Sequence, residues 1–435
     1  MENNFEQNNP SASTTNAMGN LWSKAQLGFK IGFICFLVVV LMIPTFLISS
    51  LIDERFSRNE EAVTEVQRKW SGQQMVIGPM IHIPYRFEEK QITISPDNIN
   101  FLAEPVVNVK HLGIFDIPVY TAQIKIDGNF SPIDLQKFQL QEEQLDFSRA
   151  SICITVSDYK GIPLEIPLKL NGQSSILQME TNTKGNPELS AKIDYISVRK
   201  QAINFSCSFS LKGSENLGMI PIAKNNNCRI SSKWQHPGFN GQYLPDEQNI
   251  SDSGFTATWK INQASTHIPQ VSKDESNFAQ QAFYVKIMQP INNYTTAQRS
   301  VKYALLIIGL TFLLFFFLER LGGRNIHFIQ YALVGFALVI FYSLLVSISE
   351  HLSFQWSYLI AAFMTCSLIS LYVKGILNEG KLGIAVFGTL LALYTFIYIL
   401  IQQEDYALLM GSLGLFAILA IVMYFSRKIN WHQMR

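Results

Sequence analysis

Charged residues and cysteines are both scarce in this chain of 435 residues. Asp, Glu, Lys and Arg together make up 15% of it, and the formal net charge is +1. A near-neutral chain has no strongly basic face, so we expect no nucleic-acid partner. The five cysteines include no CxxC pair and no Cys/His group at metal-ligand spacing. The sequence therefore predicts no metal and no cofactor.

The familiar catalytic motifs are also missing from the chain. It contains no GxSxG, HExxH or P-loop sequence. The histidines at 82, 111, 236 and 267 are far apart, and we interpret each as a structural histidine. We therefore expect a protein that is not an enzyme.

Six stretches of the chain are almost free of charge and rich in apolar residues. They cover residues 31–52, 301–318, 328–349, 354–373, 382–401 and 406–425, and Lys302 is their single charged residue. A bilayer core about 30 Å thick needs roughly 20 such residues as a helix. The pattern predicts six transmembrane helices, one near the N-terminus and five in the last third, so the lipid bilayer is the first expected partner.

The basic residues of the short loops predict how the helices are oriented. When the polar segments are sorted alternately to two sides, one side receives Lys24, Lys30, Arg320, Arg324, Lys374, Lys381, Arg427, Lys428 and Arg435. The loops at 350–353 and 402–405 fall on the other side and contain no Lys or Arg. By the positive-inside rule the first side is cytoplasmic. Both termini are then cytoplasmic, and the long segment between the first two runs is extracytoplasmic.

The long extracytoplasmic segment has the pattern of a β domain. Apolar residues recur at every second position in residues 121–130, 151–156, 203–211 and 255–261. Such alternation is typical of half-buried strands, and Gly-containing turns separate these segments. Among its cysteines a Cys207–Cys228 disulfide is conceivable, but free buried thiols are favoured, Cys153 included.

These observations divide the chain into five parts. We expect a disordered cytoplasmic tail (1–26), a first transmembrane helix (27–52) and a β-rich domain with a helical N-terminal stalk (53–300). A five-helix transmembrane bundle (301–425) and a short cytoplasmic tail (426–435) follow. The fold class is thus a membrane α-helical protein, arranged 1 + 5, with a large β-rich extracytoplasmic domain between helices 1 and 2.

One segment of the β domain stands out as a candidate interaction surface. Residues 233–245 (KWQHPGFNGQYLP) combine aromatic side chains with Gly and Pro. Trp234, His236, Phe239 and Tyr243 could stack on a peptide or glycan. Alternatively, the segment is a rigid turn whose aromatic side chains fill the β core.

A polar pair at the end of the third apolar run is a second candidate. Glu350 and His351 close that run at its extracytoplasmic end. A carboxylate beside a histidine raises its pKa, so the pair could sense pH. It could equally cap the helix or fix neighbouring parts of the protein.

Several long segments resemble the CreD family of bacterial inner-membrane proteins. They are residues 234–259, 301–319 and 327–354, together with PTFLISSLIDER at 44–55. The similarity runs from about residue 23 to 431 and is weakest through residues 91–148. The resemblance implies a multi-pass inner-membrane protein linked to cell-envelope integrity and envelope stress, with a periplasmic domain. It supplies no catalytic residue.

Three hypotheses follow for the function. The first is a non-enzymatic envelope-integrity protein whose β domain contacts a periplasmic protein or an envelope polymer. The second is a transporter or channel-forming subunit, which the absence of charged residues at membrane depth weakens. The third is a membrane enzyme acting on lipid-linked substrates through Glu350, His351, Glu404 or Asp405. The oligomeric state is left open.

Overall fold

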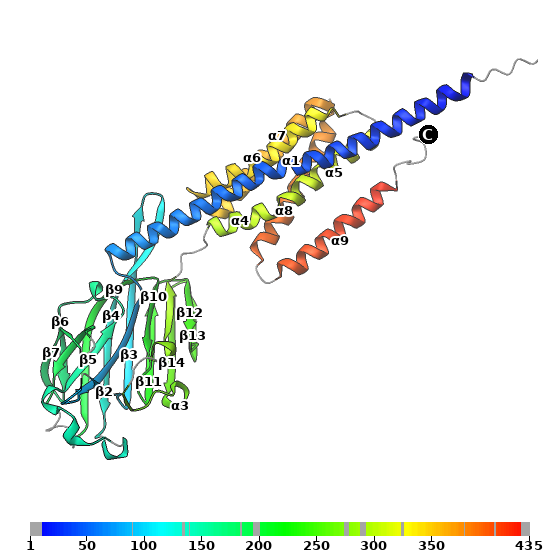
Figure 1. The fold of residues 1–435 in the computed structure, drawn as a ribbon. Helices are drawn as coiled ribbons and strands as arrows, with labels where there is room; N and C mark the ends of the chain where they lie inside the picture. Colours follow the sequence, from blue (N-terminus) through cyan, green and yellow to red (C-terminus); the bar gives the residue numbers. More distant parts are fainter. Residues whose placement is uncertain are drawn as a thin grey trace, which may run out of the picture. The chain divides into compact units, whose positions relative to one another are not determined.

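The computed structural model describes residues 11–88, 90–132, 135–138, 140–182, 185–194, 201–273, 278–287, 293–322, 326–377, 379–403 and 406–427. The chain forms two compact units. The helical unit comprises Met1–Arg58 and Ile291–Arg435, and the β domain comprises Asn59–Pro290 (Figure 1). In the chain, the β domain thus lies between the first apolar run and the other five.

The helical unit contains the beginning of α1 (Ser11–Lys69), which continues into the β domain. The remaining helices are α4 (Asn293–Lys302), α5 (Ala304–Gly322), α6 (Phe328–Ser349), α7 (Phe354–Leu377), α8 (Gly380–Gln402) and α9 (Ala407–Ser426). Among the described residues, five helices are long and apolar enough to cross a membrane. The pair α4 and α5, bent by 45°, makes a sixth if it counts as one span.

The structure differs from the expected boundaries of the first helix. We expected disorder up to residue 26, whereas α1 is helical from Ser11. Extending an existing helix is much easier than nucleating a new one, so an apolar helix can carry a polar extension. Past residue 52, α1 continues to Lys69.

The α1, α5 and α6 helices pack closely in the helical unit. Gly335 on α6 has no side chain where Leu41 of α1 and Phe312 of α5 approach it. A Cβ atom at this position would clash with Leu41 Cδ1 and would lie 3.0 Å from Phe312 Cζ. Such small residues let helices approach closely in membranes.

Two polar contacts join the same helices near the ends of the first apolar run. At one end, Lys30 of α1 forms an ion pair with Glu319 of α5, and the Tyr331 hydroxyl donates to Glu319 Oε2 at 3.0 Å. At the other end, Arg55 Nε lies 3.4 Å from Glu350 Oε1 at the end of α6. The first contact is the more buried, with side-chain exposures of 12% for Lys30 and 3% for Glu319.

Among its described residues, the β domain is built on one large sheet of 16 strands. The strands are β1 (Gln74–Pro84), β2 (Gln91–Ile94), β3 (Asn98–Leu112), β4 (Phe115–Phe130), β5 (Ser151–Val156), β6 (Glu165–Leu170), β7 (Gln173–Thr181), β8 (Pro187–Lys192), β9 (Ile203–Ser214), β10 (Asn216–Ile220), β11 (Asn225–Ser232), β12 (Pro237–Gly241), β13 (Glu247–Ser251), β14 (Gly254–Asn262), β15 (Val271–Ser272) and β16 (Phe283–Ile287). The alternating segments predicted from the sequence lie within β4, β5, β9 and β14, so those strands are confirmed.

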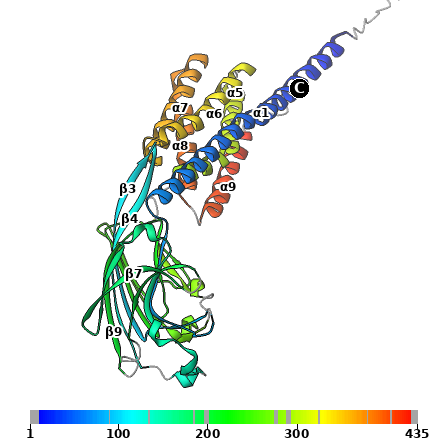
Figure 2. The same cartoon turned by 60° about the vertical axis from the view of Figure 1, so that its left-hand side comes forward.

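The order of the strands shows that the sheet curls around a core. The order is β12-β16-β10-β1-β5-β8-β7-β6-β9-β4-β3-β11-β14-β13, and β2 with β15 extends it beside β1. The two ends of this order, β12 and β13, are consecutive in the chain. The few residues between them span at most about 20 Å, so the ends of the sheet must approach each other. Figure 2 shows the curl, together with the long hairpin of β3 and β4.

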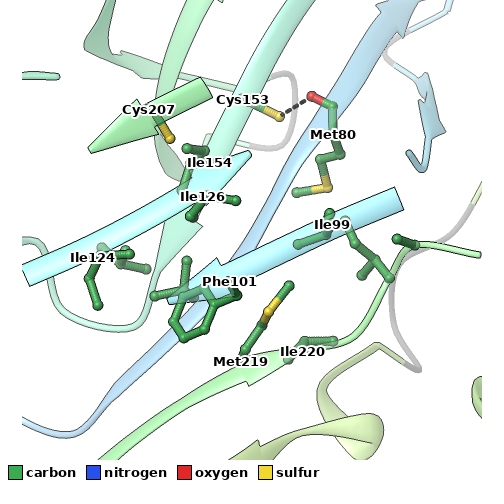
Figure 3. Close-up of a cluster of buried hydrophobic side chains, with 14 of the residues drawn as sticks. Met80, Ile99, Phe101, Ile124, Ile126, Cys153, Ile154, Cys207, Met219 and Ile220 are labelled. Atoms are coloured by element: carbon green, nitrogen blue, oxygen red, sulfur yellow. Dashed lines mark hydrogen bonds between the residues drawn. The ribbon is translucent and has the colours of Figure 1, made fainter. Parts of the chain in front are cut away.

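One hydrophobic core fills the curled sheet. Phe101, Ile124, Ile126 and Met219 are among its fully buried members, and they come from β3, β4 and β10 (Figure 3). All described cysteines of the domain are free, as favoured from the sequence. Burial raises the pKa of the Cys207 thiol to about 12 and that of Cys228 still further, so both act as apolar side chains.

Candidate recognition site on the β domain

A cavity of about 620 Å³ lies on the face of the sheet where β3, β11, β14 and β13 run side by side. We call it the outer-face cavity. Its lining consists of Glu104, Pro105, Val106, Val107, Ser231, Ser232, Lys233, Trp234, Asn249, Ser251, Ser253, Gly254, Phe255 and Thr256. Residues that are far apart in the sequence therefore line the same cavity.

The strand register explains the polar part of this lining. Ser231 on β11 is paired with Thr256 on β14, which is paired in turn with Asn249 on β13. Paired residues point to the same face, while their neighbours Ile230 and Ala257 point into the core and are fully buried. The outer face therefore presents a row of hydroxyl and amide groups.

Trp234 provides the aromatic side of the cavity. Its backbone N–H donates to Ser232 Oγ at 3.3 Å, and Ser232 Oγ donates to the Pro105 carbonyl at 2.5 Å. These bonds fix the turn after β11 onto β3. The Trp234 ring is half-buried against the core and meets the exposed His236 ring edge-on at 6.3 Å.

The other aromatic residues of the predicted surface, Phe239 and Tyr243, are half-buried and pack against the core. The Phe239 ring lies 6.0 Å from the rings of Phe255 and Trp259. The Tyr243 hydroxyl donates to Gln281 Oε1 at 2.6 Å, and the Tyr243 carbonyl accepts from Trp259 Nε1 at 3.2 Å. Burial raises the pKa of Tyr243. The segment is thus divided: Trp234 lines a cavity, His236 is beside it, and Phe239 and Tyr243 fill a turn.

The Glu350–His351 pair is separate from this cavity and lies in the helical unit. Glu350 ends α6, and its carboxylate is paired with Arg55. The His351 side chain is exposed, and its backbone N–H donates to the Ile348 carbonyl at 3.0 Å. The contact that the structure gives Glu350 is therefore one between helices. Glu404 and Asp405, candidates of the enzyme hypothesis, lie outside the described residues.

The sequence did not point to several residues that line the cavity or form clusters. Glu104, Asn249 and Thr256 are polar residues on strands, and only the register brings them beside Trp234. A buried group of His82, Cys153 and Glu188 was also missed, because its members lie on three strands. In the sequence, each of these three is only a polar or titratable residue within a largely apolar strand. Such residues are common in proteins, so the pattern alone does not indicate a site.

The family model for "Inner membrane protein CreD" matches residues 26–432. The inner membrane protein CreD of Escherichia coli (strain K12) is 28% identical over 427 residues, which cover 94% of each chain. An M1 zinc metallopeptidase structure from Deinococcus radiodurans aligns at 6% identity with 48% of this chain and 53% of its own, with a TM-score of 0.21. That score is too low to support any conclusion about fold or function. The two sequence matches cover nearly the whole chain, and the chain therefore belongs to the CreD family of inner membrane proteins.

Proposed function

We propose that this protein crosses the inner membrane six times and recognises a polymer of the cell envelope with its periplasmic β domain. In this proposal the protein contributes to envelope integrity without catalysing a reaction. The observation that carries the proposal is the outer-face cavity, which combines Trp234 with a row of polar side chains on the large domain of a membrane protein.

The chemistry of the cavity favours a glycan over an apolar ligand. A sugar ring offers an apolar face that stacks on an aromatic side chain and a rim of hydroxyl groups. The side chains of Glu104, Ser231, Asn249 and Thr256 supply acceptors and donors for such a rim. A volume of about 620 Å³ is within the range of pockets that bind small ligands.

The proposed topology is supported by contacts within the helical unit. Lys30 bonds to the carbonyl of Ile326 at 2.8 Å, and positive-inside sorting assigns the segments of both residues to the cytoplasm. Arg55 pairs with Glu350, and sorting assigns both to the opposite side. Reporter fusions test the proposal: a fusion at Gln402 should report the periplasm and one at Arg427 the cytoplasm. The same side for both would overturn it.

Binding to the envelope polymer can be measured by co-sedimentation of the detergent-solubilised full chain with purified peptidoglycan sacculi. We expect Trp234→Ala to weaken binding about tenfold, which corresponds to about 1.4 kcal/mol, because the stacking face is lost. Phe87→Ala is the matched control, since Phe87 is an exposed aromatic residue of the same domain outside the cavity. Equal binding by both variants and the native chain would contradict the glycan proposal.

A photocrosslinking residue at position 234 in living cells gives an independent test. Capture of glycan is the expected result, whereas reproducible capture of one periplasmic protein would replace the polymer with a protein partner. Deletion of the gene should change tolerance to detergents or β-lactams, and no change would argue against an envelope role.

A second cavity supports transport as the alternative function. It has a volume of about 400 Å³ within the helical unit, and its lining includes Trp356, Tyr358, Tyr394 and Tyr398. A transport route through this unit should depend on its polar residues, so Glu350→Gln and His351→Gln should abolish a measurable flux. Unchanged flux in both variants would rule out this alternative.

A further inference from the structure

Three potential metal ligands converge inside the β domain, at a place separate from the outer-face cavity. They are His82 on β1, Cys153 on β5 and Glu188 on β8, and their ligand atoms all lie within 4.8 Å of one another. His82 Nδ1 is 3.3 Å from Cys153 Sγ and 3.3 Å from Glu188 Oε2. These strands are direct neighbours in the sheet, in the order β1-β5-β8.

The register places the three side chains on one face of the sheet. Cys153 is paired with Met80 on β1 and with Ser190 on β8. His82 and Glu188 each lie two residues from those partners, so they point to the same face as Cys153. The neighbours Ile152 and Ile154 are buried on the opposite face, so β5 is enclosed on both sides here.

The group is deeply buried, and one of its oxygen atoms lacks a hydrogen bond. His82, Cys153 and Glu188 are 3%, 0% and 5% exposed. Glu188 Oε2 has no hydrogen-bond partner among the described residues, although it is within ion-pair distance of His82 Nδ1. A buried carboxylate oxygen without a partner is costly unless something else neutralises it.

We propose that His82, Cys153 and Glu188 bind a Zn²⁺ ion that joins β1, β5 and β8. Thiolate, imidazole and carboxylate are all ligands that zinc accepts. Tetrahedral zinc, with bonds of about 2.0–2.3 Å, places neighbouring ligand atoms about 3.3–3.6 Å apart. The two 3.3 Å separations around His82 Nδ1 agree with that spacing.

Charge also favours a divalent cation in this position. When the Cys153 thiol gives up its proton to solvent, the thiolate and the Glu188 carboxylate carry two negative charges, and neutral His82 carries none. One Zn²⁺ ion makes the buried group neutral. The carboxylate oxygen that lacks a hydrogen bond then becomes a ligand of the ion. Without the ion, the Glu188 carboxylate is buried 3.3 Å from His82 Nδ1, and burying a charge is costly.

The site is structural in this proposal. Its three ligands are buried, and none of them lines the outer-face cavity. An ion there would crosslink strands separated by 71 residues between His82 and Cys153 and by a further 35 to Glu188. Water or the second carboxylate oxygen completes the four positions around the ion. The inference stands independently of the proposed glycan binding.

The test uses the full chain purified in detergent, stripped with a chelator and then loaded with Co²⁺ or Zn²⁺. We expect about one ion per chain by elemental analysis, and a thiolate-to-cobalt charge-transfer band in the absorption spectrum. Cys153→Ser should abolish that band, and Glu188→Gln should lower the affinity at least tenfold. Cys207→Ser is the matched control, because Cys207 is a buried thiol of the same sheet outside the group.

A variant that retains only Cys153, with serine at the other four cysteine positions, keeps the test decisive if Cys153→Ser fails to fold. This variant should show the cobalt band at the native intensity. The proposal is overturned if the native chain binds no ion, if its cobalt complex has no thiolate band, or if Cys207→Ser loses the band while Cys153→Ser retains it.

Discussion

The β domain and the helical unit expose different kinds of side chain, although both bury an apolar core. In the β domain, Ile99 and Phe101 of β3 are fully buried, whereas Asn98 and Asn100 on the same strand are exposed. In the helical unit, Phe416 of α9 is 73% exposed, while Lys30 and Glu319 are largely hidden. None of the residues of α9, all of which are described, is buried.

The difference indicates that each unit is adapted to a different solvent. In water, burial of apolar surface stabilises a fold by about 25 cal/mol per Å². Between helices in lipid that driving force is absent, because lipid tails are as apolar as leucine side chains. Close packing and polar contacts must then hold the helices together. Substitutions test this difference, because their effects on stability should differ between the two units.

The largest expected effect comes from the buried ion pair of the helical unit. Glu319→Ala leaves the Lys30 ammonium buried without its partner, which should destabilise the unit by about 3–5 kcal/mol. Thermal unfolding of the full chain in detergent, followed by fluorescence-detected size exclusion, measures the loss. The double variant Lys30→Met with Glu319→Leu should recover most of it, since no unpaired charge is left. If the double variant is as unstable as the single one, the loss of stability comes from altered packing and not from an unpaired charge.

A matched pair of truncations compares the two solvents directly. Phe101→Ala removes a fully buried ring from the β core and should lower stability by about 3–5 kcal/mol. Phe416→Ala removes a ring of the same size from the exposed face of α9 and should change stability by less than about 0.5 kcal/mol. Near-UV circular dichroism during heating gives both values. A large effect at Phe416 would mean that α9 packs on a protein partner in place of lipid.

A smaller effect is expected where Gly335 lets α6 pack closely against α1. Gly335→Ala forces a methyl group against Leu41 and should destabilise the helical unit by about 1–3 kcal/mol. Gly309→Ala in α5 is the control, because a methyl group added there would have no atom of a neighbouring element within 4 Å. Adding Leu41→Ala should relieve the clash in the Gly335 variant. Equal melting temperatures for the two alanine variants would contradict close packing as the main stabilising contact.

The sequence predicted helices and strands better than it predicted which of them lie side by side. Alternation in residues 151–156 identified β5, because each side chain reports its own face. The parallel pairing of β1 with β10, and of β3 with β11, joins strands more than a hundred residues apart. Local pattern contains no information on such pairs. The bend between α4 and α5 near Tyr303 was likewise hidden inside an apolar stretch.

The same limit applies to the candidate sites. Density of aromatic residues pointed to residues 233–245, but it could not separate Trp234, which lines a cavity, from Phe239, which packs in the core. The distinction depends on β12 pairing with β16, which turns Phe239 inward. Cys153 and Glu188 were invisible as a pair for the same reason, since three strands must assemble before they meet.

The smallest expected effect is a pH dependence of the stability of the β domain, which comes from Asp97. Burial alone would raise the pKa of Asp97, but hydrogen bonds from Lys224 Nζ and the Ser131 N–H, both at 2.5 Å, outweigh it and lower the pKa. A lowered pKa in the folded state stabilises the fold above the unfolded-state pKa of about 3.9, and this contribution is lost as the pH falls through the folded value. Asp97→Asn should therefore cost on the order of 1 kcal/mol at neutral pH, and the difference from the native chain should shrink below about pH 4. Melting temperatures of both chains from pH 3 to pH 7 measure it, with Lys224→Met as the control that removes the partner. A difference that stays constant over this range would mean that Asp97 acts through the shape of its hydrogen bonds and that its charge contributes nothing.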